Sequence, residues 1–91
     1  MTPEQKALAR HALGLPHRSR KSWRNHFVAD EGSADYETWR QLVELGFARR
    51  RAGNALSGGG DVFWLTRAGA DRAIEPGEKL GIEHFPKLGA H

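Results

Sequence analysis

The chain has 91 residues, of which 38% are hydrophobic and 27% charged, a balance typical of one folded domain with a modest core and not of a disordered chain. It contains no cysteine, which excludes disulfide bonds and thiolate metal sites, and no apolar run near the roughly 20 residues of a membrane span or typical of a signal peptide, which predicts a cytoplasmic protein without a membrane partner. The formal net charge of +3 is compatible with a nucleic-acid partner and excludes nothing about the fold.

The first predicted element is a helix over residues 3–13. Thr2 is placed to cap it, and Gln5 is placed to complete a capping box three residues later. Gly14 is a natural helix terminator, so residues 16–22 are expected to form a basic loop.

Residues 23–29 are ambiguous, because Trp23 and Phe27 share one face of either a helix or a strand. We favour a short helix or an irregular turn for this segment. In either arrangement we expect Trp23 and Phe27 to anchor the core.

The second predicted helix runs from about Ala34 to Leu45. Ser33 or Asp35 is placed to cap it, and Gly46 ends it. Its apolar side chains recur at helical spacing and are expected to face the core; they are Tyr36, Trp39, Leu42 and Val43.

A β-hairpin is predicted next. Residues 47–51 form its first strand, with the arginines outward, residues 52–60 form a long flexible connection, and residues 62–65 form the return strand. Thr66 then caps a helix over residues 67–74.

The C-terminal part contains helix-breaking residues and no periodicity. We therefore place one folded domain over residues 1–76 and a loosely ordered tail over residues 77–91. Phe85 is the expected docking point of this tail on the domain.

The segment LVELGFARR, from Leu42 to Arg50, is followed by FWLTRAG, from Phe63 to Gly69. This pair of segments resembles the winged-helix regulators, including the multiple-antibiotic-resistance regulators, in which a helix ending L-x-x-x-G-L-[IV]-x-R is followed by a hairpin wing and then by Y-x-L-T-x-x-G. The resemblance covers about residues 36–74. It implies that the domain over residues 1–76 is an α+β, winged-helix-like domain with three to four helices and a β-hairpin wing.

A longer pattern, which begins with RNHF at residues 24–27 and continues to Gly46, is similar to small phage- or prophage-encoded proteins of uncharacterised function. This second resemblance implies a bacterial cytoplasmic setting and no particular activity. Together the two resemblances make a non-enzymatic, DNA-binding phage or prophage regulator or accessory protein our first hypothesis.

The helix before the hairpin departs from the regulator pattern. In those regulators a second, recognition helix places its N-terminal residues against base edges, whereas here that helix begins with Asp35 and Glu37, whose charge opposes phosphate binding. Arg40 and Gln41 lie on its outer face and could read guanine and adenine. Arg40 is equally placed to pair with glutamates three and four residues away, so base reading and a solvated helix face both stay open.

Two basic clusters are candidate phosphate contacts. The hairpin cluster comprises Arg49, Arg50 and Arg51, of which Arg49 and Arg51 share one strand face while Arg50 points to the other. The alternative role of this cluster is to protect an edge strand from aggregation by charge. The loop cluster comprises Arg18, Arg20, Lys21 and Arg24. Arg24 is structural instead if it anchors to an acid such as Asp30.

The rival hypothesis is a protein–protein interaction module of the same fold that binds no DNA. If Phe63 and Leu65 face the core, Val62 and Trp64 face outward and are candidates for a partner-binding or homodimer surface. The alternative is that the first helix or the C-terminal tail covers them. Fold alone does not decide between the two functions.

Other chemistries lack their sequence patterns. The histidines match no metal-ligand spacing, the glycine run after Ser57 lacks the lysine and hydroxyl of a phosphate-binding loop, and the sequence shows no catalytic constellation. We therefore expect no enzyme activity, no metal, no cofactor and no small-molecule ligand.

Overall fold

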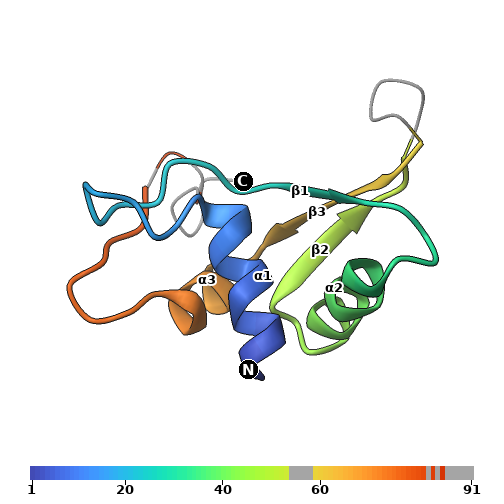
Figure 1. The fold of residues 1–91 in the computed structure, drawn as a ribbon, viewed down its shortest axis with the longest axis horizontal. Helices are drawn as coiled ribbons and strands as arrows, with labels where there is room; N and C mark the ends of the chain where they lie inside the picture. Colours follow the sequence, from blue (N-terminus) through green and yellow to red (C-terminus); the bar gives the residue numbers. More distant parts are fainter. Residues whose placement is uncertain (54–58, 82, 84, 86–91) are drawn as a thin grey trace.

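The computed structural model describes residues 1–53, 59–81, 83 and 85 of the chain. These residues form three helices and a three-stranded antiparallel sheet with strand order β1-β3-β2 (Figure 1). In chain order the elements are α1 Pro3–Leu13, β1 Phe27–Ala29, α2 Ala34–Glu44, β2 Ala48–Arg51, β3 Asp61–Leu65 and α3 Arg67–Ala73. The predicted α+β class is confirmed, and none of these helices is long and apolar enough to cross a membrane.

Each helix begins after a residue whose side chain caps it, and these capping residues are among those predicted. At α1 the Thr2 hydroxyl accepts a hydrogen bond from the Gln5 amide at 3.1 Å, while the Gln5 side chain accepts one from the Thr2 amide at 2.9 Å. Ser33 and Thr66 cap α2 and α3 by accepting from backbone N–H groups three residues ahead, at 3.2 and 3.1 Å. Each contact satisfies an N–H group that the helix leaves unpaired, so these boundaries follow from short segments of sequence.

The strand β1 corrects the prediction for residues 23–29. A short helix or irregular turn is wrong for residues 27–29, because they pair with β3, with Phe27 opposite Phe63. Just before the strand, the Asn25 side chain continues the pairing: its Nδ2 donates to the Leu65 carbonyl at 3.0 Å, and its Oδ1 accepts from the Leu65 amide at 2.8 Å. This partner lies 40 residues further along the chain, where the local pattern could not reveal it.

Trp23 does not anchor the core, since it is 52% exposed. Its indole Nε1–H donates to the Gly14 carbonyl at 3.0 Å, so the ring is held at the end of α1 instead of between the helices and the sheet. The prediction of a core anchor is therefore wrong for Trp23. Phe27 is a partly buried member of the core, with its ring centroid 5.5 Å from that of Trp39.

The core lies between the helices and one face of the sheet. Trp39 of α2 and Phe63 of β3 are fully buried, and their rings stack with centroids 5.6 Å apart. Leu13, Leu42 and Leu65 are also fully buried. These side chains come from α1, α2 and β3, so burial of apolar surface joins both helices to the sheet.

The pairing register of β2 with β3 decides which side chains of the hairpin lie on the face of the sheet that carries the core. Ala48 lies opposite Leu65 and Arg50 lies opposite Phe63, and of these only Arg50 is exposed. The side chain of Arg50 therefore extends from β2 on the face of the sheet that the helices cover. The prediction that Arg50 points to the other strand face from Arg49 and Arg51 is confirmed. The prediction that all the arginines of this strand point away from the core is wrong for Arg50.

The described part of residues 77–85 packs against the rest of the chain. Lys79 forms backbone hydrogen bonds with Arg20 and Ser22 at 2.8 and 2.9 Å. Leu80 is 9% exposed, and Phe85, the expected docking point, is 7% exposed. Part of the predicted loose tail is thus built into the fold, while residues 86–91 lie outside the described residues.

The ion pair between Arg10 of α1 and Glu78 ties this segment to the domain. The guanidinium donates to the two carboxylate oxygens at 2.5 and 2.8 Å, and the side chains are 16% and 9% exposed. The hydrogen bonds from Arg10 hold the pKa of Glu78 below its ordinary value of 4.5. A depressed pKa in the folded state means that this stabilisation is present above about pH 4.5 and is lost as the pH falls through the lower pKa.

We expect Glu78→Gln to lower the free energy of unfolding at neutral pH by about 1 kcal/mol, a figure that allows for solvent screening. The difference from the wild type should be smaller at a pH below the lowered pKa of Glu78 than at neutral pH, because the carboxylate is then protonated in both the folded and the unfolded state. Urea unfolding at several pH values measures both effects. The control is Glu37→Gln, which removes an exposed pair and should change stability little; an effect of Glu78→Gln that is equal at both pH values contradicts the prediction.

Candidate nucleic-acid interface

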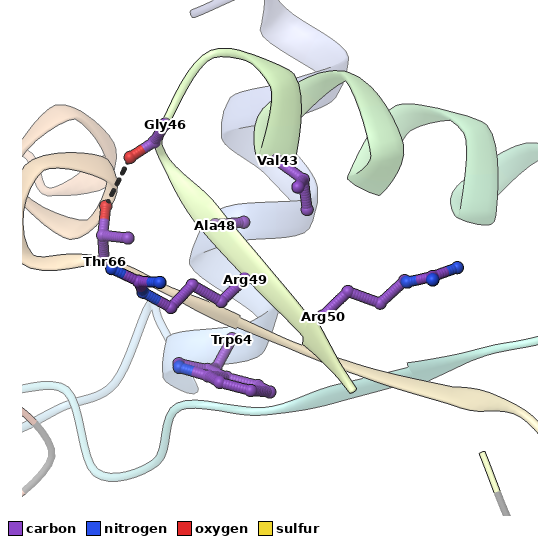
Figure 2. A pocket seen from close by; sticks show the side chains of 7 residues that line it. All are labelled: Val43, Gly46, Ala48, Arg49, Arg50, Trp64 and Thr66. Carbon is purple, nitrogen blue, oxygen red and sulfur yellow. Dashed lines mark hydrogen bonds between the residues drawn. The ribbon is translucent and has the colours of Figure 1, made fainter. Parts of the chain in front are cut away.

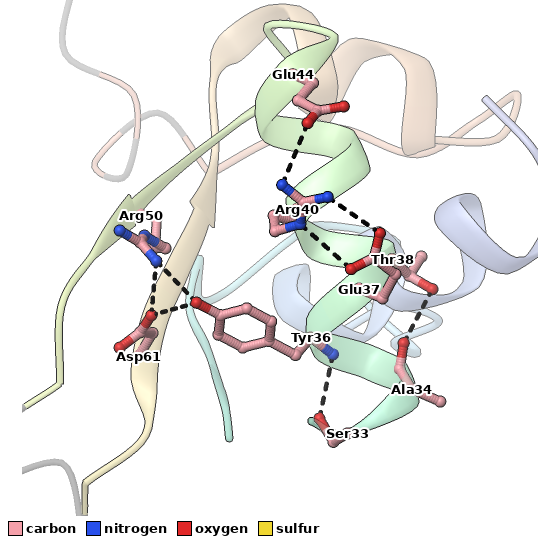
Figure 3. Close-up of polar contacts among 9 residues, drawn as sticks. All are labelled: Ser33, Ala34, Tyr36, Glu37, Thr38, Arg40, Glu44, Arg50 and Asp61. Atoms are coloured by element: carbon pink, nitrogen blue, oxygen red, sulfur yellow. Dashed lines mark hydrogen bonds and ion pairs between the residues drawn. The ribbon is translucent and has the colours of Figure 1, made fainter. Parts of the chain in front are cut away.

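Both residues of α2 that were predicted to read bases form hydrogen bonds with other residues of this chain. Arg40 donates from Nε to Glu37 at 3.2 Å and from Nη1 to Glu44 at 3.3 Å (Figure 3), and the hydrogen bond to Glu37 raises the pKa of Arg40. The Gln41 side-chain oxygen accepts from the buried Gln5 amide at 3.1 Å. Of the two alternatives left open for Arg40, the structure has the intrahelical pairs, so this face of α2 presents little uncompensated positive charge.

Arg50, one of the predicted phosphate contacts, joins a polar network near the loop end of the β2–β3 hairpin (Figure 3). Its Nη1 donates to the Tyr36 hydroxyl at 2.7 Å and to Asp61 Oδ2 at 3.1 Å, and the Tyr36 hydroxyl donates to the same carboxylate at 2.7 Å. The Gly53 amide donates to Asp61 Oδ1 at 2.8 Å. These bonds lower the pKa of Asp61, the one from Tyr36 most, and the bond to Asp61 raises the pKa of Tyr36.

The network gives Arg50 a structural role, because it pins both strands of the hairpin to α2. Sequence reasoning missed it, since Tyr36 lies 25 residues and Arg50 lies 11 residues from Asp61. The available signal was strand alternation: Arg50 and Asp61 both fall on the core side of the strands once the register is known. Only that register places the three side chains together.

We expect Asp61→Ala to speed hydrogen exchange of the Gly53 amide by about tenfold, because this amide loses its acceptor and the loop end of the hairpin loosens. Amide exchange followed by NMR measures the effect. Asp71→Ala is the matched control, since Asp71 accepts from Arg67 at 3.1 Å in an exposed pair on α3 and should leave Gly53 unchanged. Unaltered exchange at Gly53 in Asp61→Ala would show that the network does not hold the hairpin.

The face of the hairpin that points away from the core carries the remaining residues that were predicted to bind DNA or a protein partner. Arg49 lies opposite Trp64 and Arg51 opposite Val62, so alternation predicted their common face correctly. Both arginines are exposed, and no ion pair joins either to the described part of the chain. We call the surface formed by Val28, Arg49, Arg51, Val62 and Trp64 the open sheet face.

A shallow groove of about 520 Å³ follows β2 at the free edge of the sheet. Figure 2 shows Arg49 and Trp64 together on one side of β2, with Arg50 directed away from both. The floor includes Gly46, whose carbonyl accepts from the Thr66 hydroxyl at 2.9 Å. The lining residues are Val43, Gly46, Ala48, Arg49, Arg50, Trp64 and Thr66. Its chargeable groups are arginines alone, which suits an anionic surface better than a reacting substrate.

The loop cluster divides into one structural and three free cations. Arg24 donates to the His11 carbonyl from Nε and Nη2 at 3.2 and 2.7 Å, so it anchors the loop to a helix carbonyl and not to an acid. The side chains of the other three are exposed and have no ion-pair partner within the described ranges; they are Arg18, Arg20 and Lys21. In Figure 1 this loop lies at one end of the molecule and the hairpin extends toward the other, so the two basic clusters form separate surfaces.

The residues that the structure describes contain no group of three or more metal-ligating side chains. His84, His91 and the Ser57–Gly58 part of the glycine run lie outside the described residues. Comparison of the chain with protein-family models, with curated protein sequences and with solved structures gives no match in any of the three.

Proposed function

We propose that this chain is a non-enzymatic domain that binds duplex DNA through the open sheet face. The observation that carries the proposal is the pair Arg49 and Arg51, two exposed cations on one strand face without an acidic partner in the described part of the chain. Alternate strand residues lie about 7 Å apart, so each guanidinium can reach its own phosphate. Arginine donates in a fork that matches phosphate oxygens.

The order of helices and strands, which we compare with that of a winged-helix domain, supports the same function. A helix, α2, leads into the β2–β3 hairpin, α3 follows it, and β1 completes a sheet of order β1-β3-β2. We propose that the hairpin acts as the wing of such a domain. Wings contact the phosphate backbone, and such contacts position a protein on DNA without reading its sequence.

The helix α2 does not suit the role of a recognition helix. Its first turn carries Asp35 and Glu37, and Arg40 and Gln41 already have partners within the protein. Binding through the hairpin alone should therefore discriminate weakly between DNA sequences. An accessory protein of a phage or prophage fits this behaviour better than a sequence-reading regulator does.

A titration with duplex DNA, followed residue by residue through NMR amide shifts at low salt, tests the proposal. We expect the largest shifts at Arg49, Arg51, Val62 and Trp64, with a steep loss of affinity as salt is added. Shifts confined to α2, or no shifts at low salt, would refute binding through the open sheet face.

A protein–protein interaction module is the second candidate, favoured by the apolar part of the same face. Val28 is 46% exposed, and Val62 and Trp64 are half-buried beside it. Apolar side chains grouped on one exposed face are typical of protein contacts. If the chain forms a homodimer through them, Trp64→Ala should convert it to a monomer in analytical ultracentrifugation; a wild-type monomer at high concentration argues against this form.

A further inference from the structure

Trp23 is an exposed aromatic side chain held in one position. Half of its surface faces solvent, at 52% exposed, yet its indole Nε1–H donates to the Gly14 carbonyl at 3.0 Å and its amide donates to the Leu13 carbonyl at 3.1 Å. A Cβ on Gly14 would lie 2.1 Å from Nε1, so only glycine lets the ring lie there. The Arg24 guanidinium sits 4.7 Å from the centroid of the ring. The indole is thus fixed on the end of α1 while much of it is left uncovered.

Exposed cations lie in the loop just before this ring. Arg18, Arg20 and Lys21 precede it in the same loop, are exposed, and have no ion pair with any described residue. A parallel bridge places Lys79 beside Lys21, which adds a fourth exposed cation. The loop is held in place, because the Arg20 amide donates to the His17 carbonyl and the Lys79 amide donates to the Arg20 carbonyl, both at 2.8 Å.

A groove continues from this cluster along β1. It has a volume of about 320 Å³ and is lined by His11, Arg24, His26, Phe27 and Val28. Arg24 lines the groove and also covers the Trp23 ring, so the ring and the groove adjoin. An extended ligand that contacts Trp23 can therefore continue into this groove, whose lining includes one arginine and two histidines.

We propose that Trp23 is a stacking platform for an unpaired base, and that this surface binds single-stranded nucleic acid. An aromatic ring beside a basic track is the usual means of binding single strands without sequence preference, since every base has a face to stack and every nucleotide has a phosphate to pair. Within a duplex, the base faces are covered by their neighbours, so this site suits single strands. We call the surface formed by Arg18, Arg20, Lys21, Trp23 and Arg24 the Trp23 platform.

Two other partners fit this surface less well. Insertion into a membrane requires a larger apolar area, and residues 16–22 contain no aliphatic or aromatic residue other than proline and histidine. A protein partner of ordinary interface size requires an apolar centre, whereas the neighbours of Trp23 in the loop are cations. The proposal does not depend on duplex binding by the open sheet face, because no residue of the Trp23 platform belongs to that face; Val28, at the end of the groove along β1, borders both.

The decisive experiment measures the affinity of the full chain for a fluorescein-labelled oligo-dT of about 12 nucleotides, a length within the usual site size, by anisotropy at low salt. We expect Trp23→Ala to weaken binding by about tenfold, and Trp23→Phe, which keeps an aromatic face, to retain most of it. Trp64→Ala is the matched control, since it removes a half-buried tryptophan from the other surface, and it should bind as the wild type does. Equal affinity of Trp23→Ala and the wild type overturns the proposal.

A second readout avoids reliance on one variant. In the Trp64→Phe protein only Trp23 and the fully buried Trp39 emit, so quenching by unlabelled oligo-dT reports contact with Trp23. Arg18→Gln with Lys21→Gln should lower the slope of log affinity against log salt by about 1.4, or 0.7 for each lost phosphate contact. Anionic vesicles that shift Trp23 emission while oligo-dT does not would overturn the proposal in favour of a lipid surface.

Different outcomes refute the duplex-binding proposal and the single-strand proposal. Arg49→Gln with Arg51→Gln should weaken duplex binding and spare oligo-dT, and Trp23→Ala should do the reverse. A chain that binds oligo-dT through Trp23 but shows no duplex affinity removes only the function proposed for the open sheet face. A chain that binds duplex DNA but not oligo-dT removes only the Trp23 platform.

Discussion

Arg49→Gln combined with Arg51→Gln is expected to weaken duplex DNA binding by about tenfold or more at low salt. Each exposed guanidinium is proposed to hold one phosphate, and release of counterions from B-DNA contributes about 0.9 to the salt slope for each phosphate neutralised. The slope of log affinity against log salt should therefore fall by about 1.8. Fluorescence anisotropy of a labelled duplex at several salt concentrations measures both quantities.

The control for this variant removes the same charge from paired arginines. Arg40 pairs with Glu37, and Arg67 pairs with Asp71, so Arg40→Gln with Arg67→Gln lowers the net charge by two without touching the open sheet face. This double variant should retain nearly all of the duplex affinity. If the two double variants lose affinity equally, net charge and not a defined surface explains the binding, and the proposed interface is wrong.

Trp39→Ala is expected to lower the free energy of unfolding by about 4 kcal/mol. Trp39 is fully buried, stacks on Phe63 with centroids 5.6 Å apart, and lies 5.5 Å from the ring of Phe27. Removal of the indole leaves a cavity between α2 and the sheet. Since a domain of this size has about 5–15 kcal/mol of stability, urea unfolding should show a large drop in the midpoint.

A milder substitution at the same position separates volume from hydrogen bonding. Trp39 Nε1 is buried without a hydrogen-bond partner among the described residues, so Trp39→Phe gives up some volume but removes an unsatisfied donor. We expect its stability to lie within about 1 kcal/mol of the wild type. Trp64→Ala, on the open sheet face, should cost clearly less than Trp39→Ala; equal losses would show that Trp39 is not at the centre of the core.

Much of the fold could be predicted from the sequence where the determining contacts are local. The caps Thr2, Ser33 and Thr66 each act within three residues, so the helix starts are visible in short segments. The strand β1 could not be predicted in this way, because residues 27–29 gain their partner only when β3 is brought beside them. Trp23 was misplaced for the same reason, since its position depends on the carbonyl of Gly14 at the end of α1.

The sequence by itself determined which charged side chains share a face, because alternation along a strand and periodicity along a helix are properties of the backbone. It placed Arg49 and Arg51 on one face of their strand and Val62 and Trp64 on the outward face of theirs, and the register then brings the two pairs onto the same face of the sheet. Only the tertiary structure decided which cations are free to bind an anion. Asp61 pairs with the charge of Arg50, whose guanidinium also donates to the Tyr36 hydroxyl, whereas Arg49 has no acidic partner in the described part of the chain. An ion pair depends on distances between residues that the chain brings together only when it folds.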